Sequence, residues 1–78
     1  MQTDQPPDWV SLRRRAIGAR LRDARTRAEL SQERLAELAG IDRKTVVRLE
    51  GGYSDARLTV WLRLARAVGV PLAELVRE

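Results

Sequence analysis

Three cationic side chains lie close together in the stretch RKTVVRLE, residues 43–50: Arg43, Lys44 and Arg48. At about 100° per residue in an α-helix, these three and Val47 occupy one half of the helix circumference. The other half carries Thr45, Val46, Leu49 and Glu50. Guanidinium and ammonium groups donate hydrogen bonds to phosphates and to guanine O6 and N7, and a valine methyl fits against a thymine methyl. The pattern favours a helix that offers a cationic face to the major groove of DNA; the alternative is a basic face exposed only to solvent.

The distribution of charge along the chain matters more for this hypothesis than the total. The net charge is +4 and the sequence pI is about 11.0, which favours an anionic partner. Residues 31–52 are neutral, with four basic and four acidic side chains, whereas residues 11–28 carry seven arginines against one aspartate. We therefore expect the basic residues of 43–48 to act by position. Long-range attraction to DNA is expected to come mostly from the arginine-rich segment.

The composition excludes several classes of protein. The 78 residues suffice for one domain with a modest core. The chain has no Cys and no His, which excludes disulfides and most zinc sites and removes the usual general base. Without a constellation for catalysis, we predict no enzyme, no cofactor and no metal. No apolar run reaches the ~20 residues of a membrane span and the N-terminus lacks the pattern of a signal peptide, so we expect a cytoplasmic protein.

The apolar residues recur at spacings of three and four, which is typical of helices, and no stretch alternates as a strand does. The sequence therefore predicts an all-α, compact domain of five helices. Their expected bounds are Asp8 or Ser11 to about Ala28, then 32–39, 43–50, 58–68, and a short fifth helix that Pro71 opens and that ends at Val76. Residues 1–10 are expected to form a flexible leader, and residues 11–78 the single domain.

The second and third of these helices are separated by only three residues, 40–42. Ser31 and Asp42 are expected N-caps, and Gly40 is expected to end the second helix with a positive φ. So short a turn fits two helices that cross at ~90–120°. The residues expected to face the core are Leu12, Ile17, Leu21, Ala24, Leu35, Ala36, Ala39, Val46, Leu49, Leu58, Trp61, Leu64, Ala65 and Val68.

A longer pattern carries a resemblance to a known family. It comprises Ser31-Gln32, Leu35-Ala36, Gly40-Ile41, Val46, Leu49-Glu50 and Gly52. In this register the segment resembles the helix-turn-helix of the phage-repressor and Xre-type transcriptional regulators. The resemblance extends over roughly residues 17–76. It implies a lambda repressor-like domain that binds double-stranded DNA and regulates transcription, expected to be a repressor, with helix 43–50 in the major groove. It further implies a nucleoid-associated protein of a prokaryote or phage.

The resemblance also implies roles for single residues. Arg43, Lys44 and Arg48 fall where the family reads base edges, with Val47 beside them. Contacts to the DNA backbone are implied for Gln32, Thr45, Gly51, Ser54 and Arg57, and Tyr53 has a hydroxyl that suits a phosphate. Arg25 and Glu50 fall where the family has a structural ion pair between its first and third helices.

We also expect the protein to act as a homodimer. A two-fold dimer on a pseudo-palindromic site would place two recognition helices ~34–36 Å apart. The C-terminal apolar residues Leu62, Leu72, Leu75 and Val76 form the candidate dimer patch. Two alternatives stay open: an antitoxin that also binds a toxin protein and regulates its own operon, and a helical protein-interaction domain that does not bind DNA.

Overall fold

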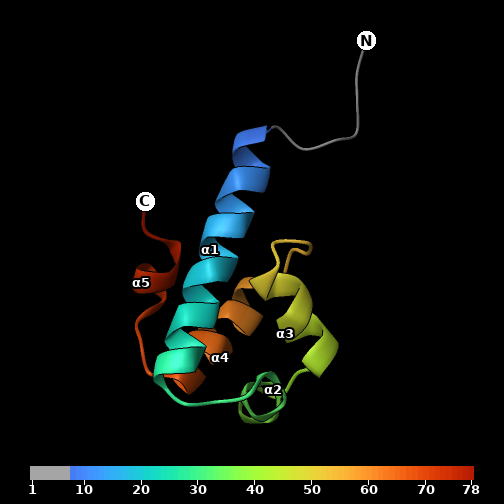
Figure 1. The fold of residues 1–78 in the computed structure, drawn as a ribbon, viewed down its shortest axis with the longest axis vertical. Coiled ribbons are helices and arrows are strands. Elements are labelled where there is room, and N and C mark those ends of the chain that lie inside the picture. The colour runs from blue at the N-terminus through green and yellow to red at the C-terminus, as the bar shows by residue number, and fades with distance from the viewer. Residues whose placement is uncertain (1–7) are drawn as a thin grey trace.

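The computed structural model describes residues 8–78, and the elements it contains there are five α-helices (Figure 1). They are α1 (Asp8–Arg27), α2 (Gln32–Ala39), α3 (Arg43–Glu50), α4 (Leu58–Val68) and α5 (Leu72–Val76). The predicted all-α, five-helix class is therefore confirmed. Residues 8–10 of the predicted leader belong to α1, and residues 1–7 lie outside the described residues. Within residues 8–78 no helix combines the length and apolar character needed to cross a membrane.

The turn between α2 and α3 has the backbone geometry that its residues predict. The Ser31 hydroxyl accepts a hydrogen bond from the Arg34 backbone N–H at 2.9 Å, which caps α2. Gly40 ends α2 with φ = 71°, in the left-handed region. Asp42 occupies the N-cap position of α3, but its side chain makes no capping hydrogen bond, so that part of the prediction is wrong. The direction of α3 thus depends on the turn and on packing, without help from the Asp42 carboxylate.

Side chains from all five helices meet in one core. The largest fully buried ones are Leu21, Leu35, Val46, Leu49, Leu64 and Leu75. Helix α2 packs against α3 and α4, while α1 packs against α3, α4 and α5. The expectation that Leu12 faces the core is wrong, because the residue is 63% exposed. Five residues separate Leu12 from Ile17, which is about 140° of helical rotation, and this step turns Leu12 away from the bundle.

The middle of α1 lies directly on the C-terminal end of α3. A Cβ atom on Gly18 would lie 2.3 Å from the carbonyl oxygen of Leu49 and 2.7 Å from that of Glu50. A Cβ on Gly52, where φ is 77°, would lie 2.9 Å from the Arg15 Cα. Glycine is required at both places because the two backbones approach without room for a side chain. This contact fixes the distance between α1 and α3.

Two arginines near the start of α1 hold distant parts of the chain. Arg14 makes a bidentate ion pair with Asp55 in the α3–α4 loop, at 2.9 Å from Nε to Oδ1 and 2.7 Å from Nη2 to Oδ2. Arg13 Nη2 donates to the carbonyl oxygen of Val76 at 2.7 Å, at the C-terminal end of α5. Both side chains therefore have intramolecular partners, and they tie α1 to the loop after α3 and to α5.

We expect Gly18→Ala to lower the free energy of unfolding by about 1–3 kcal/mol, because the added Cβ would push α1 away from α3. Helix propensity alone predicts the opposite sign, since alanine is favoured over glycine in a helix by about 0.5–1 kcal/mol. Ala19→Gly at the exposed neighbouring position is the matched control, and it should cost only that propensity difference. Urea denaturation measures both variants. A Gly18→Ala protein as stable as the wild type would contradict the close approach of the two helices.

Candidate nucleic-acid interface

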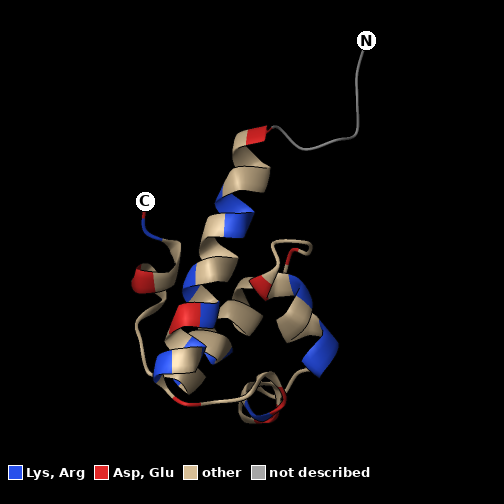
Figure 2. Ribbon diagram, viewed as in Figure 1, with Lys and Arg blue, Asp and Glu red and all other residues tan. Residues whose placement is uncertain are grey.

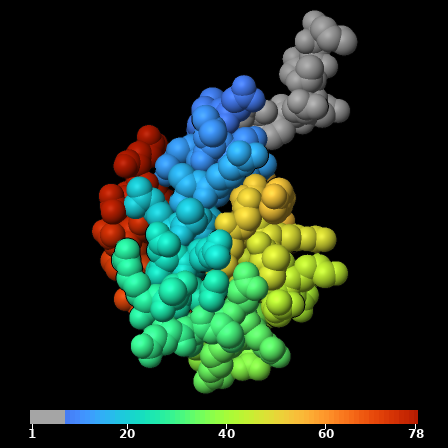
Figure 3. All heavy atoms as spheres, in the orientation of Figure 1, coloured from blue at the N-terminus to red at the C-terminus, as the bar shows by residue number. Residues whose placement is uncertain are grey.

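Helix α3 has one buried and one exposed side. Val46 is 0% and Leu49 is 2% exposed, so these two anchor α3 in the core. The opposite side carries Arg43, Lys44, Val47 and Arg48, all exposed, and Thr45 is partly buried at the border between the two sides. Figure 2 shows basic residues near both ends of α3, and in Figure 3 the side chains of this region project from one side of the molecule. The division of α3 into two faces agrees with the helical wheel of the sequence.

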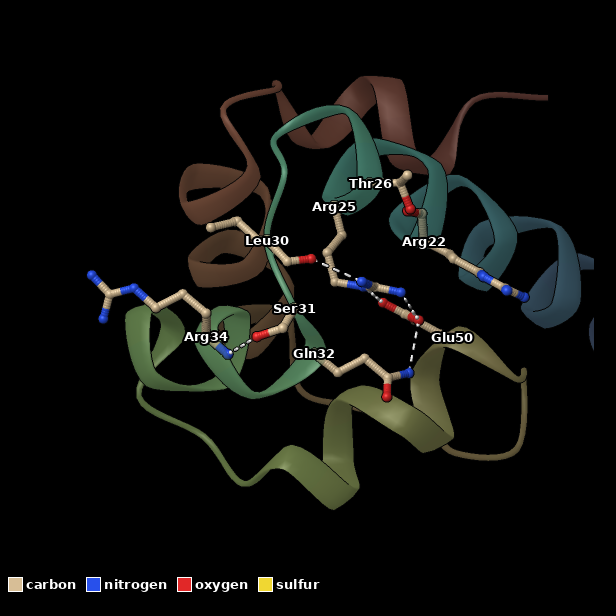
Figure 4. Close-up of polar contacts among 8 residues, drawn as sticks. All are labelled: Arg22, Arg25, Thr26, Leu30, Ser31, Gln32, Arg34 and Glu50. Atoms are coloured by element: carbon tan, nitrogen blue, oxygen red, sulfur yellow. Dashed lines mark hydrogen bonds and ion pairs between the residues drawn. The ribbon is translucent and has the colours of Figure 1, made fainter.

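A buried carboxylate links α3 to α1 and α2 (Figure 4). The Glu50 side chain is 4% exposed and that of Arg25 is 14% exposed. Arg25 Nε lies 2.6 Å from Glu50 Oε2, and Arg25 Nη2 donates to Oε1 at 3.2 Å. The third guanidinium nitrogen, Nη1, donates to the carbonyl oxygen of Leu30 at 2.8 Å. The ion pair implied by the family resemblance is thus present, and it also holds the chain where it enters α2.

Gln32, the first residue of α2, belongs to the same cluster. Its Nε2 donates to Glu50 Oε1 at 3.1 Å, and the residue is half-buried. This hydrogen bond uses one of the two amide N–H donors of Gln32 and leaves the other available. The first-turn backbone N–H groups of α2 lie beside this side chain, and such groups favour phosphate. A buried carboxylate on α3 therefore orients Gln32 at the start of α2.

The loop that follows α3 carries the remaining residues implied to contact a DNA backbone. The Tyr53 backbone N–H donates to the Arg48 carbonyl oxygen at 2.9 Å, and the residue is 81% exposed. The Tyr53 ring lies over Gly51, where an added Cβ would be 2.6 Å from a ring carbon. Ser54 is half-buried, and Arg57 is exposed at the N-cap position of α4. The loop is thus held close to the C-terminal end of α3.

The candidate dimer patch is corrected by the structure. Leu75 is 1% exposed and belongs to the core, and Leu72 is partly buried against that core. Leu75 faces inward because α5 packs on both α1 and α4. Leu62 and Val76 remain accessible, at 51% and 40% exposure, and Leu58 at 64% lies one turn before Leu62 on α4. The expectation that Leu58 faces the core with Trp61 is therefore wrong. Leu58 shares an exposed face of α4 with Leu62, which lies four residues further along the helix.

Sequence reasoning also missed three features that position the interface. The Arg14–Asp55 pair joins residues 41 positions apart and left no local signal. The Gln32–Glu50 hydrogen bond joins residues 18 positions apart, and it likewise left none. Gly18 did leave a signal, because glycine inside a helical pattern costs about 1 kcal/mol relative to alanine and therefore points to a packing requirement.

Comparisons with known proteins agree with this geometry. A model of the HTH_3 helix-turn-helix family matches residues 21–75, which include α2, α3 and α4. The cryptic phage CTXphi transcriptional repressor RstR of Vibrio cholerae is 35% identical over 62 residues, which are 80% of this chain and 56% of that protein. An uncharacterized HTH-type transcriptional regulator of Methanothermobacter thermautotrophicus is 41% identical over 49 residues, covering 63% of this chain and 71% of that protein.

A solved structure gives the same result. The restriction-modification controller protein C.AhdI from Aeromonas hydrophila has a TM-score of 0.76 and 43% identity, covering 78% of this chain and 92% of that chain. Over this shared region both the sequence and the arrangement of helices are similar. The match to C.AhdI spans nearly the whole of that protein, whereas this chain spans little more than half the length of the phage repressor.

The buried ion pair yields a stability prediction. Arg25→Ala leaves the Glu50 carboxylate buried without its main partner, and we expect this to lower the free energy of unfolding by about 3–5 kcal/mol. The matched control is Arg34→Ala, which breaks an ion pair to Glu37 whose side chains are 57% and 58% exposed. That loss should stay below about 1 kcal/mol. Chemical denaturation followed by circular dichroism measures both, and equal losses would show that the Arg25–Glu50 pair contributes no more than a surface pair.

Proposed function

Since this chain belongs to the HTH_3 helix-turn-helix family of transcriptional regulators, we propose that it is a repressor that recognises a specific sequence in double-stranded DNA. In this proposal α3 enters the major groove. The similarity to a phage transcriptional repressor supports the repressor role. We further propose that the protein acts in the cytoplasm and has no enzymatic activity.

The observation that carries the proposal is the division of α3 between core and solvent. Arg43, Lys44 and Arg48 offer donors that match guanine O6 and N7, and Val47 at 40% exposure offers methyl groups to thymine. The opposite side of α3 is held by Val46 and Leu49 in the core. The exposed side chains therefore sit on a rigid support, which direct reading of base edges requires.

The proposed contacts to the DNA backbone flank this helix. Gln32 offers its second amide N–H from the start of α2, and Thr45 lies at the border of α3. Gly51, Tyr53, Ser54 and Arg57 belong to the loop at the other end of α3 and to the start of α4. Contacts at both ends of a recognition helix would fix its depth and register in the groove.

We also propose that the protein binds a pseudo-palindromic site as a two-fold dimer. Two exposed apolar side chains of α4, Leu58 and Leu62, supply the candidate isologous surface together with Val76, the last residue of α5. A dimer that binds two half-sites would hold its two α3 helices ~34–36 Å apart, or one turn of B-DNA.

Selection of bound duplexes from a random-sequence pool tests base reading. The wild type should enrich a pseudo-palindromic sequence, and Arg43→Ala/Lys44→Ala should lose that enrichment, because each good bidentate contact gives about 1–3 kcal/mol of discrimination. The control is Arg63→Ala/Arg66→Ala, which removes the same charge from exposed positions of α4 and should keep the enriched sequence. If the wild type enriches nothing, α3 does not read bases.

Analytical ultracentrifugation at micromolar concentration tests the dimer. We expect the wild type to sediment as a dimer and Leu58→Glu/Leu62→Glu to sediment as a monomer, because two carboxylates would be buried in an apolar contact. Leu38→Glu is the matched control, since Leu38 on α2 is 48% exposed and lies outside the proposed surface. A wild type that stays monomeric both with and without DNA would contradict the proposed dimer.

A further inference from the structure

The seven arginines of α1 lie in different surroundings. Three of the seven are engaged inside the molecule. Arg13 donates to the Val76 carbonyl oxygen, Arg14 pairs with Asp55, and Arg25 pairs with Glu50. These three arginines therefore have partners within the protein. Any attraction of DNA by α1 has to come from the other four.

Two further arginines point away from α3. Arg20 and Arg27 line a groove of about 390 Å³ between α1 and α5, together with Val70 and Leu75. On the helical wheel they lie about 160° and 180° from Gly18, the residue that touches α3. A duplex bound along α3 would not meet these two side chains.

Arg15 and Arg22 remain, and they lie on the side of α1 next to α3. Seven residues separate them, so they share one face of the helix, about 10 Å apart along its axis and within about 60° of Gly18. The backbone of Arg15 touches Gly52, where an added Cβ would be 2.9 Å from the Arg15 Cα. Figure 4 shows the Arg22 side chain beside the Arg25–Glu50 cluster, with its guanidinium directed away from Arg25.

Both side chains are exposed, and within residues 8–78 neither guanidinium has a hydrogen bond or an ion pair. The two carboxylates that α1 contacts on α3 and on the following loop are already engaged: Glu50 by Arg25 and Gln32, and Asp55 by Arg14. Arg15 therefore adjoins the loop after α3 as a free cation. Arg22 adjoins the cluster that holds Gln32 in the same way.

We infer that Arg15 and Arg22 form a second contact line to DNA, binding phosphates of the backbone that flanks the groove occupied by α3. A guanidinium binds phosphate through paired, charge-assisted hydrogen bonds. The inference rests on the proposed function, because Arg15 adjoins the loop and Arg22 adjoins the Gln32 cluster, and both were assigned contacts to the DNA backbone. In this proposal, only two of the seven arginines of α1 contribute to the electrostatic attraction between the domain and DNA.

The salt dependence of duplex affinity tests the inference with four single variants of the full chain. Arg15→Gln and Arg22→Gln are compared with Arg20→Gln and Arg27→Gln, which remove the same charge from the far side of α1. The probe is one fluorescein-labelled duplex several helical turns long, followed by anisotropy over a series of KCl concentrations. Each lost phosphate contact should reduce the slope of log affinity against log salt by about 0.9. Arg15→Gln and Arg22→Gln should each show this reduction, and the two controls should keep the wild-type slope.

Charge-conserving variants separate contact from folding. Arg15→Lys and Arg22→Lys should recover the wild-type slope, since an ammonium group also displaces the counterion of a phosphate. If the wild type binds and either Arg15→Gln or Arg22→Gln behaves like the controls, the contact line is wrong while the proposed function stands. If the wild type does not bind the duplex even at low salt, the proposed function fails and the contact line fails with it.

Discussion

The Glu50 carboxylate is the group on which the geometry of this domain depends most. With 4% exposure, it would be costly to bury without partners. Each partner fixes one spatial relation. Arg25 sets α1 against α3 and, through the Leu30 carbonyl oxygen, holds the chain that enters α2. Gln32 sets the first residue of α2 against the end of α3. One buried charge thus orients both helices of the helix-turn-helix relative to α1.

This polar cluster works because the α1 and α3 backbones are already in contact. Gly18 lets α1 rest on the last carbonyl groups of α3, and Gly52 lets the following loop pass Arg15. With the distance set in this way, the Arg25 side chain reaches Glu50 and the Arg14 side chain reaches Asp55. Packing and electrostatics therefore support the same arrangement, and agreement between levels of this kind is characteristic of sequences that specify one fold.

Local features of the sequence were sufficient for the helices and for the two faces of α3, because periodicity and turn residues act over a few positions. They were insufficient in three kinds of place. Leu12 was misplaced because a step of five residues changes the side of a helix. Leu75 was misplaced because a helix of five residues is too short for its period to show which side faces inward. The Gln32–Glu50 and Arg14–Asp55 contacts join elements that only the folded chain brings together. The DNA contacts at Arg43, Lys44 and their neighbours stay predictions, since cations serve phosphates and bases alike.

The arginines of α1 show why net charge is a poor guide to an interface. Arg14 and Arg25 add no free cation to the surface near α3, but each neutralises a carboxylate there, on Asp55 and Glu50. Carboxylates left free at those positions would repel a phosphate backbone. The surface around α3 is therefore positive in part because the fold pairs two nearby carboxylates with arginines of α1. Segment 31–52 can be neutral in sequence and still present a cationic face, because one of its four carboxylates, Glu50, is buried with an arginine from outside the segment.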